Sequence, residues 1–106
     1  MPQYKPPVSI GRSWFVPRGF AGWVPRKRTI RFSRSANVTA RLLAHELCHV
    51  MQAEKAPWPG AYVAQWIASG FSYANMPFEV EARKAETEPF YRDWASVILA
   101  SRGGRI

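Results

Sequence analysis

The sequence predicts an α+β fold, with a short N-terminal β-hairpin or small sheet followed by three to four helices. Two patterns lead to this prediction. Prolines and glycines interrupt residues 1–26, whereas apolar residues recur at three- and four-residue steps after residue 38. The chain has 106 residues, 47% of them hydrophobic, so we expect residues 1–106 to form a single domain around a modest core.

The N-terminal third of the chain is expected to be extended or turning. Residues 1–26 contain five prolines and three glycines, a density that disfavours helix. The segments "GFAGWVP" and "RKRTIRFS" predict two short strands joined by a turn, because apolar Ile30 and Phe32 alternate with polar neighbours. Arginine on the outer face of residues 29–33 predicts an edge strand there.

The remainder of the chain is expected to form helices. The longest runs from about Val38 to Glu54, contains no Gly or Pro, and can begin at a Ser35, Asn37 or Thr39 cap. Further helices are expected over residues 61–69, 78–88 and 90–101. Gly70 is suited to end the first of these, and Pro77 to the first turn of the second.

The charge of the chain is uneven. Its net charge is +8, and residues 1–45 contain nine basic residues and no acidic one. Such a basic half favours attraction to nucleic acid or to an acidic partner, and a merely solvated surface is the alternative.

The single cysteine and the lengths of the apolar stretches indicate the cellular compartment in which the protein is expected. Cys48 has no partner for an intramolecular disulfide, which favours a reducing compartment, and we expect it to be a small core residue. The N-terminus lacks the apolar run of a signal peptide, and no apolar stretch approaches the ~20 residues that cross a bilayer. The sequence therefore predicts a cytoplasmic protein with no membrane association.

Residues 45–49, "HELCH", contain a pattern typical of zinc hydrolases. Helical residues four apart lie on one face, so His45 and His49 can bind one ion, while Glu46 lies beside it without being a ligand. Zn²⁺ suits two neutral imidazoles, a third ligand and a water. The expected chemistry is attack by a zinc-bound water after Glu46 takes its proton. An amphipathic helix whose histidines are packed or solvated is the alternative.

The third ligand is expected to be a carboxylate, because the chain has only two histidines. The acidic residues that follow the motif are Glu54, Glu79, Glu81, Glu86, Glu88 and Asp93. The helix over residues 78–88 can pack antiparallel against the first, with Phe78, Ala82 and Ala85 facing inward. Periodicity places Glu81 slightly closer to that face than Glu79, and Glu86 is comparable by angle.

The segments "HELCHVMQ" and "NMPFEVEARKAE" together resemble the gluzincin class of zinc metallopeptidases. They look most like the minigluzincins and related short zincin-like domains of bacteria and phages. The resemblance covers roughly residues 28–88 and implies a small zincin-like domain. Carried over by position, it implies His45, His49 and Glu81 as zinc ligands and Glu46 as general base, with Glu79 as the alternative ligand.

The chain departs from that family in the groups around the ligands. The acid that commonly follows the ligand glutamate by four residues, and that holds the first histidine, is replaced by Ala85. Residues that could hold a histidine instead are Gln52, Glu86, Glu88 and Asp93. Tyr62 and Tyr73 are candidates for stabilising the transition state, although packing roles are the simpler interpretation.

These observations favour a zinc-dependent metallopeptidase that hydrolyses a peptide or protein substrate. The strand over residues 29–33 could hold that substrate by strand addition. The alternative is a non-catalytic, zinc-containing binding module whose basic N-terminal half docks nucleic acid or an acidic protein. A third possibility is a metallopeptidase that stays inactive until a partner completes its cleft. No oligomeric state is predicted.

Overall fold

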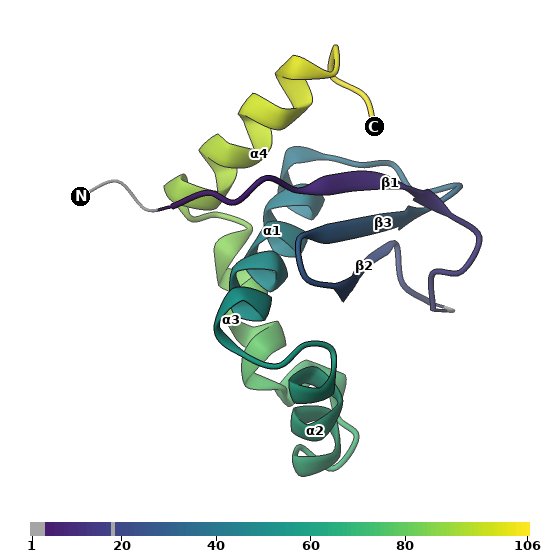
Figure 1. Ribbon diagram of the computed structural model, residues 1–106, viewed down its shortest axis with the longest axis vertical. Coiled ribbons are helices and arrows are strands. Elements are labelled where there is room, and N and C mark those ends of the chain that lie inside the picture. The colour runs from purple at the N-terminus through teal and green to yellow at the C-terminus, as the bar shows by residue number, and fades with distance from the viewer. Residues whose placement is uncertain (1–3, 18) are drawn as a thin grey trace.

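A three-stranded sheet precedes four α-helices in the computed structural model, which describes residues 4–17 and 19–106 and confirms the predicted α+β class (Figure 1). The strands are β1 (Ser9–Ser13), β2 (Gly22–Arg26) and β3 (Thr29–Ser33). The helices are α1 (Ala40–Lys55), α2 (Gly60–Ala68), α3 (Pro77–Ala85) and α4 (Pro89–Ser101), with a 3-10 turn, η1 (Tyr73–Asn75), before α3. None of the helices in the described part of the chain is long and apolar enough to cross a membrane.

The sheet corrects the prediction that residues 29–33 form an edge strand. Its order is β1-β3-β2, so β3 lies in the centre, parallel to β1 and antiparallel to β2. Ile30 and Phe32 are fully buried, as their alternation predicts. Arg31 does not mark a free edge, because its guanidinium reaches the neighbouring strand β1 and donates to the Ser9 carbonyl at 3.1 Å.

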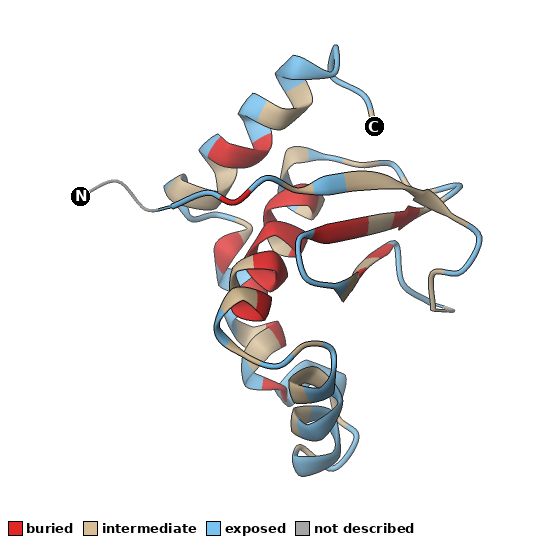
Figure 2. Cartoon of the chain, in the orientation of Figure 1, coloured by how far each residue is buried: buried red, intermediate tan, exposed pale blue. Residues whose placement is uncertain are grey.

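Helix α1 is the central element of the fold. It begins at the Thr39 cap, whose hydroxyl accepts a hydrogen bond from the Leu42 amide at 3.1 Å. The helix packs against α3, α4 and the sheet. Its buried face meets β3 and α4 in one apolar cluster that contains Val24, Ile30, Phe32, Leu43, Ala44, Leu47, Val50, Trp94 and Ala95 (Figure 2).

Helix α2 differs from α1 in that it has no buried residue. It lies at the end of the molecule away from α4, and its ribbon is exposed or intermediate throughout (Figures 1 and 2). The segment before it is tied to the sheet by Trp58, whose indole N–H donates to the Val24 carbonyl at 2.8 Å. This bond occupies one acceptor on β2, which is an edge strand.

Candidate metal centre

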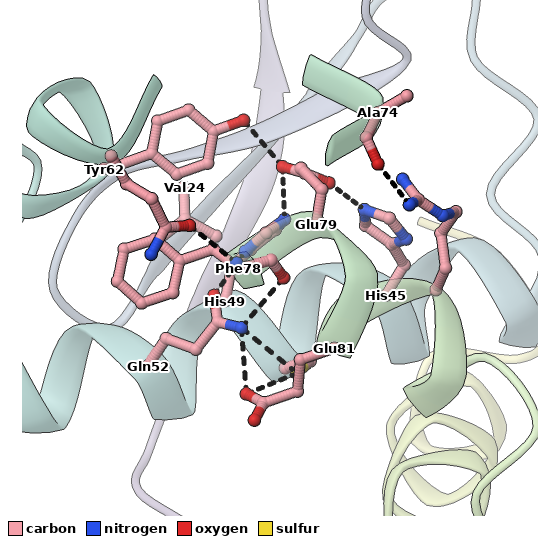
Figure 3. Close-up of polar contacts among 12 residues, drawn as sticks. Val24, His45, His49, Gln52, Tyr62, Ala74, Phe78, Glu79 and Glu81 are labelled. Carbon is pink, nitrogen blue, oxygen red and sulfur yellow. Dashed lines mark hydrogen bonds and ion pairs between the residues drawn. The ribbon is translucent and has the colours of Figure 1, made fainter. Parts of the chain in front are cut away.

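Two imidazoles from α1 and one carboxylate from α3 meet between these helices (Figure 3). One nitrogen or oxygen atom of His45, His49 and Glu79 lies within 4.8 Å of each of the others. Glu79 Oε1 is 3.0 Å from His45 Nε2, and Glu79 Oε2 is 3.0 Å from His49 Nε2. These donors form a group that could hold a metal ion.

Glu79, and not Glu81, accompanies the histidines, so the expectation that Glu81 completes the group is not met. The buried face of α3 contains Glu79, Ala82 and Ala85. Phe78 lies off this face, because its ring packs against Trp58 and Tyr62 with centroid distances of 5.4 and 6.3 Å. Glu81 is exposed on the side of α3 where it meets Gln52.

The outer nitrogen of each imidazole faces an acceptor. Glu86 Oε2 lies 2.9 Å from His45 Nδ1, and Gln52 Oε1 lies 2.7 Å from His49 Nδ1. Both residues were among the partners considered from the sequence, which offered no way to choose between them. An acceptor at Nδ1 keeps a proton on that nitrogen. Nε2, which each ring directs at Glu79, is therefore the nitrogen that is left to bind a metal ion.

The charges of the group suit a cation. Burial opposes ionisation of His45, yet its hydrogen bond to Glu79 and the charge of Glu46 raise its pKa to about 9. The pKa of His49 is raised by the same neighbours against its burial. Although Glu79 is buried, hydrogen bonds to His45 and His49 hold its pKa well below the usual range. Two Nε2 protons carry the charge of one divalent ion, so such an ion can replace them without a net change.

Glu46 follows His45 on α1 and lies beside the group without joining it. It is 4% exposed, and its burial raises the pKa of its carboxyl group, although the charges of both histidines act in the opposite direction. The residue lines two cavities, one beside each histidine. A buried carboxylate with a raised pKa is suited to accept a proton.

The two cavities differ in size and lining. The cavity beside His45 has a volume of about 640 Å³, and Thr39, Arg41 and Leu42 contribute to its wall. The cavity beside His49 has a volume of about 210 Å³ and a mainly apolar wall that includes Val24, Pro59 and Val63 together with Trp23, Trp58 and Tyr62.

Phe20, Gly22 and Tyr73 line both cavities. The rings of Phe20 and Tyr73 meet edge-on at 5.1 Å. Gly22 cannot be replaced without movement, because an added Cβ would lie 2.6 Å from the Phe32 ring.

Tyr62 and Tyr73, the two tyrosines considered from the sequence, make different contacts at the candidate metal centre. The Tyr62 hydroxyl donates to Glu79 Oε2 at 2.6 Å, so it holds the carboxylate that both histidines share. Tyr73 lines both cavities together with Glu46. A role for either residue in a transition state stays a prediction.

Cys48 is a core residue, as predicted. It is fully buried, its thiol donates to Glu81 at 3.6 Å, and burial and the Glu81 charge raise its pKa to about 12.

Several basic residues of the N-terminal half make contacts within the chain. Arg12 donates to the carbonyls of Ser33 and Ala36 at 2.7 and 2.6 Å. Arg28 pairs with Glu54 at 2.8 Å, and Arg41 pairs with Glu86 at 2.6 Å. Arg18 lies outside the described residues. Part of the predicted basic surface therefore has a structural role.

A comparison with protein-family models, with curated proteins and with solved structures found no match for this chain. The resemblance to the gluzincin class thus rests on the two short motifs alone.

Proposed function

We propose that this protein is a zinc-dependent peptidase of the gluzincin type, with His45, His49 and Glu79 as zinc ligands and Glu46 as general base. The observation that carries the proposal is the Glu79 carboxylate, which lies 3.0 Å from Nε2 of both motif histidines. Glu46 lies beside this group and faces the cavities where a substrate would bind.

The donor set favours zinc over calcium and magnesium. Two imidazole nitrogens and one carboxylate oxygen are the ligands of a well-known class of hydrolytic zinc sites. Ca²⁺ and Mg²⁺ prefer oxygen ligands throughout. When bound, zinc polarises a carbonyl oxygen and makes a water more acidic.

The residues of the chain divide the remaining tasks. Glu46 would take a proton from the attacking water and return it to the leaving amine. Tyr62 holds Glu79 in place through its hydroxyl. Tyr73, which lines both cavities together with Glu46, is the candidate to donate a hydrogen bond to the substrate carbonyl.

The cavities indicate how a peptide would lie. The mainly apolar cavity beside His49 suits an apolar or aromatic side chain, and its volume of about 210 Å³ admits one such group. The strand at the edge of the sheet beside this cavity is β2, which takes the place of residues 29–33 in the proposed strand addition. Main-chain pairing there must avoid the Val24 carbonyl, which Trp58 already occupies.

Metal content tests the first half of the proposal. Protein purified without added metal and then equilibrated with zinc is expected to bind about one ion per chain. His45→Ala and Glu79→Ala should abolish this binding, whereas Glu54→Ala, an acidic control at the exposed end of α1, should retain it. Zinc binding that survives Glu79→Ala would refute the ligand set.

Cleavage of a mixed peptide library tests the second half. We expect Glu46→Gln to lower the rate at least about a hundredfold while zinc content stays unchanged, because the general base is lost. Glu54→Gln is the matched control, since it makes the same chemical change on the same helix away from the cavities. Equal cleavage by wild type and Glu46→Gln would rule out the proposed mechanism.

A non-catalytic binding module is the second candidate, and one surface feature favours it. Trp14 and Phe15 are 76% and 85% exposed, and the Arg34 guanidinium lies 4.5 Å from the Trp14 ring centroid. Aromatic and basic groups of this kind stack on single-stranded nucleic acid. Binding of DNA that weakens with salt, is lost in Trp14→Ala and is unaffected by Glu46→Gln would favour this function.

A further inference from the structure

Gln52 connects the candidate metal centre to the opposite side of α3 (Figure 3). Its Oε1 accepts from His49 Nδ1 at 2.7 Å. Its Nε2 donates to the Phe78 carbonyl at 3.0 Å and to Glu81 Oε1 at 2.9 Å. The Gln52 side chain is buried, whereas Glu81 is exposed. One amide thus joins a surface carboxylate to a buried imidazole.

The chemistry of these partners determines which way the amide faces. A backbone carbonyl and an ionised carboxylate can only accept hydrogen bonds. The amide NH₂ of Gln52 must therefore face Phe78 and Glu81, because the reverse orientation would place its oxygen against two acceptors. The carbonyl oxygen of Gln52 is left facing His49.

The orientation of the amide decides the tautomer of His49. With an oxygen at 2.7 Å, Nδ1 keeps its proton, so Nε2, which faces Glu79, is the nitrogen that gives up its proton when a metal ion binds. A reversed amide would favour the tautomer with the proton on Nε2. That tautomer cannot bind a metal ion through Nε2.

We propose that Glu81 is a positioning residue for the metal centre: its carboxylate holds the Gln52 amide so that His49 presents Nε2 to the ion. This inference rests on the zinc site proposed above. Glu81 and Gln52 line a cavity of about 540 Å³ that shares no lining residue with the two cavities beside the histidines. Glu81 therefore acts on His49 through Gln52, without touching ligand or substrate.

The test compares zinc affinity and the Nδ1–H signal of zinc-bound His49 in three variants. Glu81→Ala removes the acceptor, and Glu81→Gln retains an oxygen that can accept from Gln52. Glu88→Ala removes the same charge from the same cavity and is the matched control. The chain contains only two histidines, so the ¹H–¹⁵N NMR spectrum of each zinc-loaded protein reports the Nδ1–H group of His49 directly.

We expect Glu81→Ala to weaken zinc binding up to about tenfold, which is the smallest loss of metal affinity typical for removing a group that orients a metal ligand. The loss should be small because the Phe78 carbonyl still accepts one hydrogen of the Gln52 amide. In the zinc-loaded spectrum of this variant the His49 Nδ1–H signal should be broadened by exchange, because Glu81 no longer holds the amide that accepts from it. Glu81→Gln and Glu88→Ala should match the wild type in both measurements.

Two results would overturn the inference while leaving the zinc site intact. One is a Glu81→Ala protein whose zinc affinity and His49 Nδ1–H signal equal those of the wild type. The other is a loss of affinity as large in Glu81→Gln or Glu88→Ala as in Glu81→Ala. If the wild type binds no zinc at all, the proposed function fails, and the positioning role fails with it.

Discussion

The two histidines of the candidate centre have one partner in common and one that differs. Nε2 of each lies 3.0 Å from Glu79. On the outer side, His45 meets the Glu86 carboxylate, which is itself paired with Arg41 at 2.6 Å. His49 meets the neutral amide of Gln52 instead. The imidazole of His45 is thus held by an anion, whereas the imidazole of His49 is held by an amide.

The surroundings of the two rings explain the difference. The side chains of His45 and Glu86 are 13% and 18% exposed, so water can stabilise a charge there. The His49 side chain is only 5% exposed, and a second carboxylate beside it would have to be desolvated. We infer that solvent conditions act mainly on the His45 end, whereas packing and hydrogen-bond orientation determine the His49 end.

The largest loss of stability should follow from removing Glu79, the residue that contacts both histidines. Glu79→Ala leaves both Nε2 atoms without their carboxylate and should destabilise the zinc-free protein by about 3 kcal/mol, as for other broken buried pairs. Urea unfolding in EDTA measures this loss. Glu81→Ala, two residues along the same helix, is the control and should cost much less, and equal losses would contradict the shared role of Glu79.

Exchanging the outer partners should have unequal effects. Gln52→Glu places a buried carboxylate against the Phe78 carbonyl and Glu81, and we expect it to cost about 3 kcal/mol. Glu86→Gln puts an amide at the more exposed end and should cost about 1 kcal/mol. Chemical denaturation of both zinc-free variants checks the order. A larger loss in Glu86→Gln would show that the two ends are not distinguished by burial.

The pH dependence of stability should reverse when zinc binds. Without metal, the raised pKa of His45 gives a stabilisation that is complete below pH 6.5 and is lost as the pH rises through about 9. With zinc, both rings must be deprotonated, so stability should instead rise as the pH increases through 6.5. The slope is up to about 1.4 kcal/mol per pH unit for one proton. Thermal unfolding with EDTA and with zinc, at a series of pH values, tests the sign.

The smallest effect is expected at the exposed end of the His45 contacts. Arg41→Met removes the guanidinium that pairs with Glu86, and because the Arg41 side chain is 67% exposed the cost should be below about 1 kcal/mol. High salt should abolish the difference from wild type. A salt-independent loss would indicate that Arg41 contributes through packing, which thermal unfolding at two salt concentrations distinguishes.

Local patterns in the sequence were enough to predict that the helices form, although α3 ends at Ala85 and not at residue 88. The Thr39 cap, the uninterrupted stretch that follows it and the proline that begins α3 all act within one or two turns. The sheet was predicted only in part. The sequence of β1, "SIGRS", shows little alternation, and its pairing with β3 joins residues about twenty positions apart. That pairing is what makes β3 central.

The sequence could not predict that Glu79 lies beside the histidines in place of Glu81, and the reason is similar. Periodicity within α3 ranks Glu81 and Glu79 almost equally, and the choice depends on where Phe78 packs. Phe78 joins rings from residues 58 and 62, which the pattern of α3 does not reveal. The motif histidines needed no such information, because four-residue spacing on one helix is a local property.

The absence of buried residues in α2 has a consequence for how this protein can change over evolution. Val63 on α2 and Pro59 just before it line the smaller cavity, yet the core does not depend on this helix. Substitutions at Val63, which is 48% exposed, can therefore reshape the cavity at little cost in folding free energy. Selection could alter the preferred ligand there while α1 and α3 keep the His45, His49 and Glu79 group unchanged.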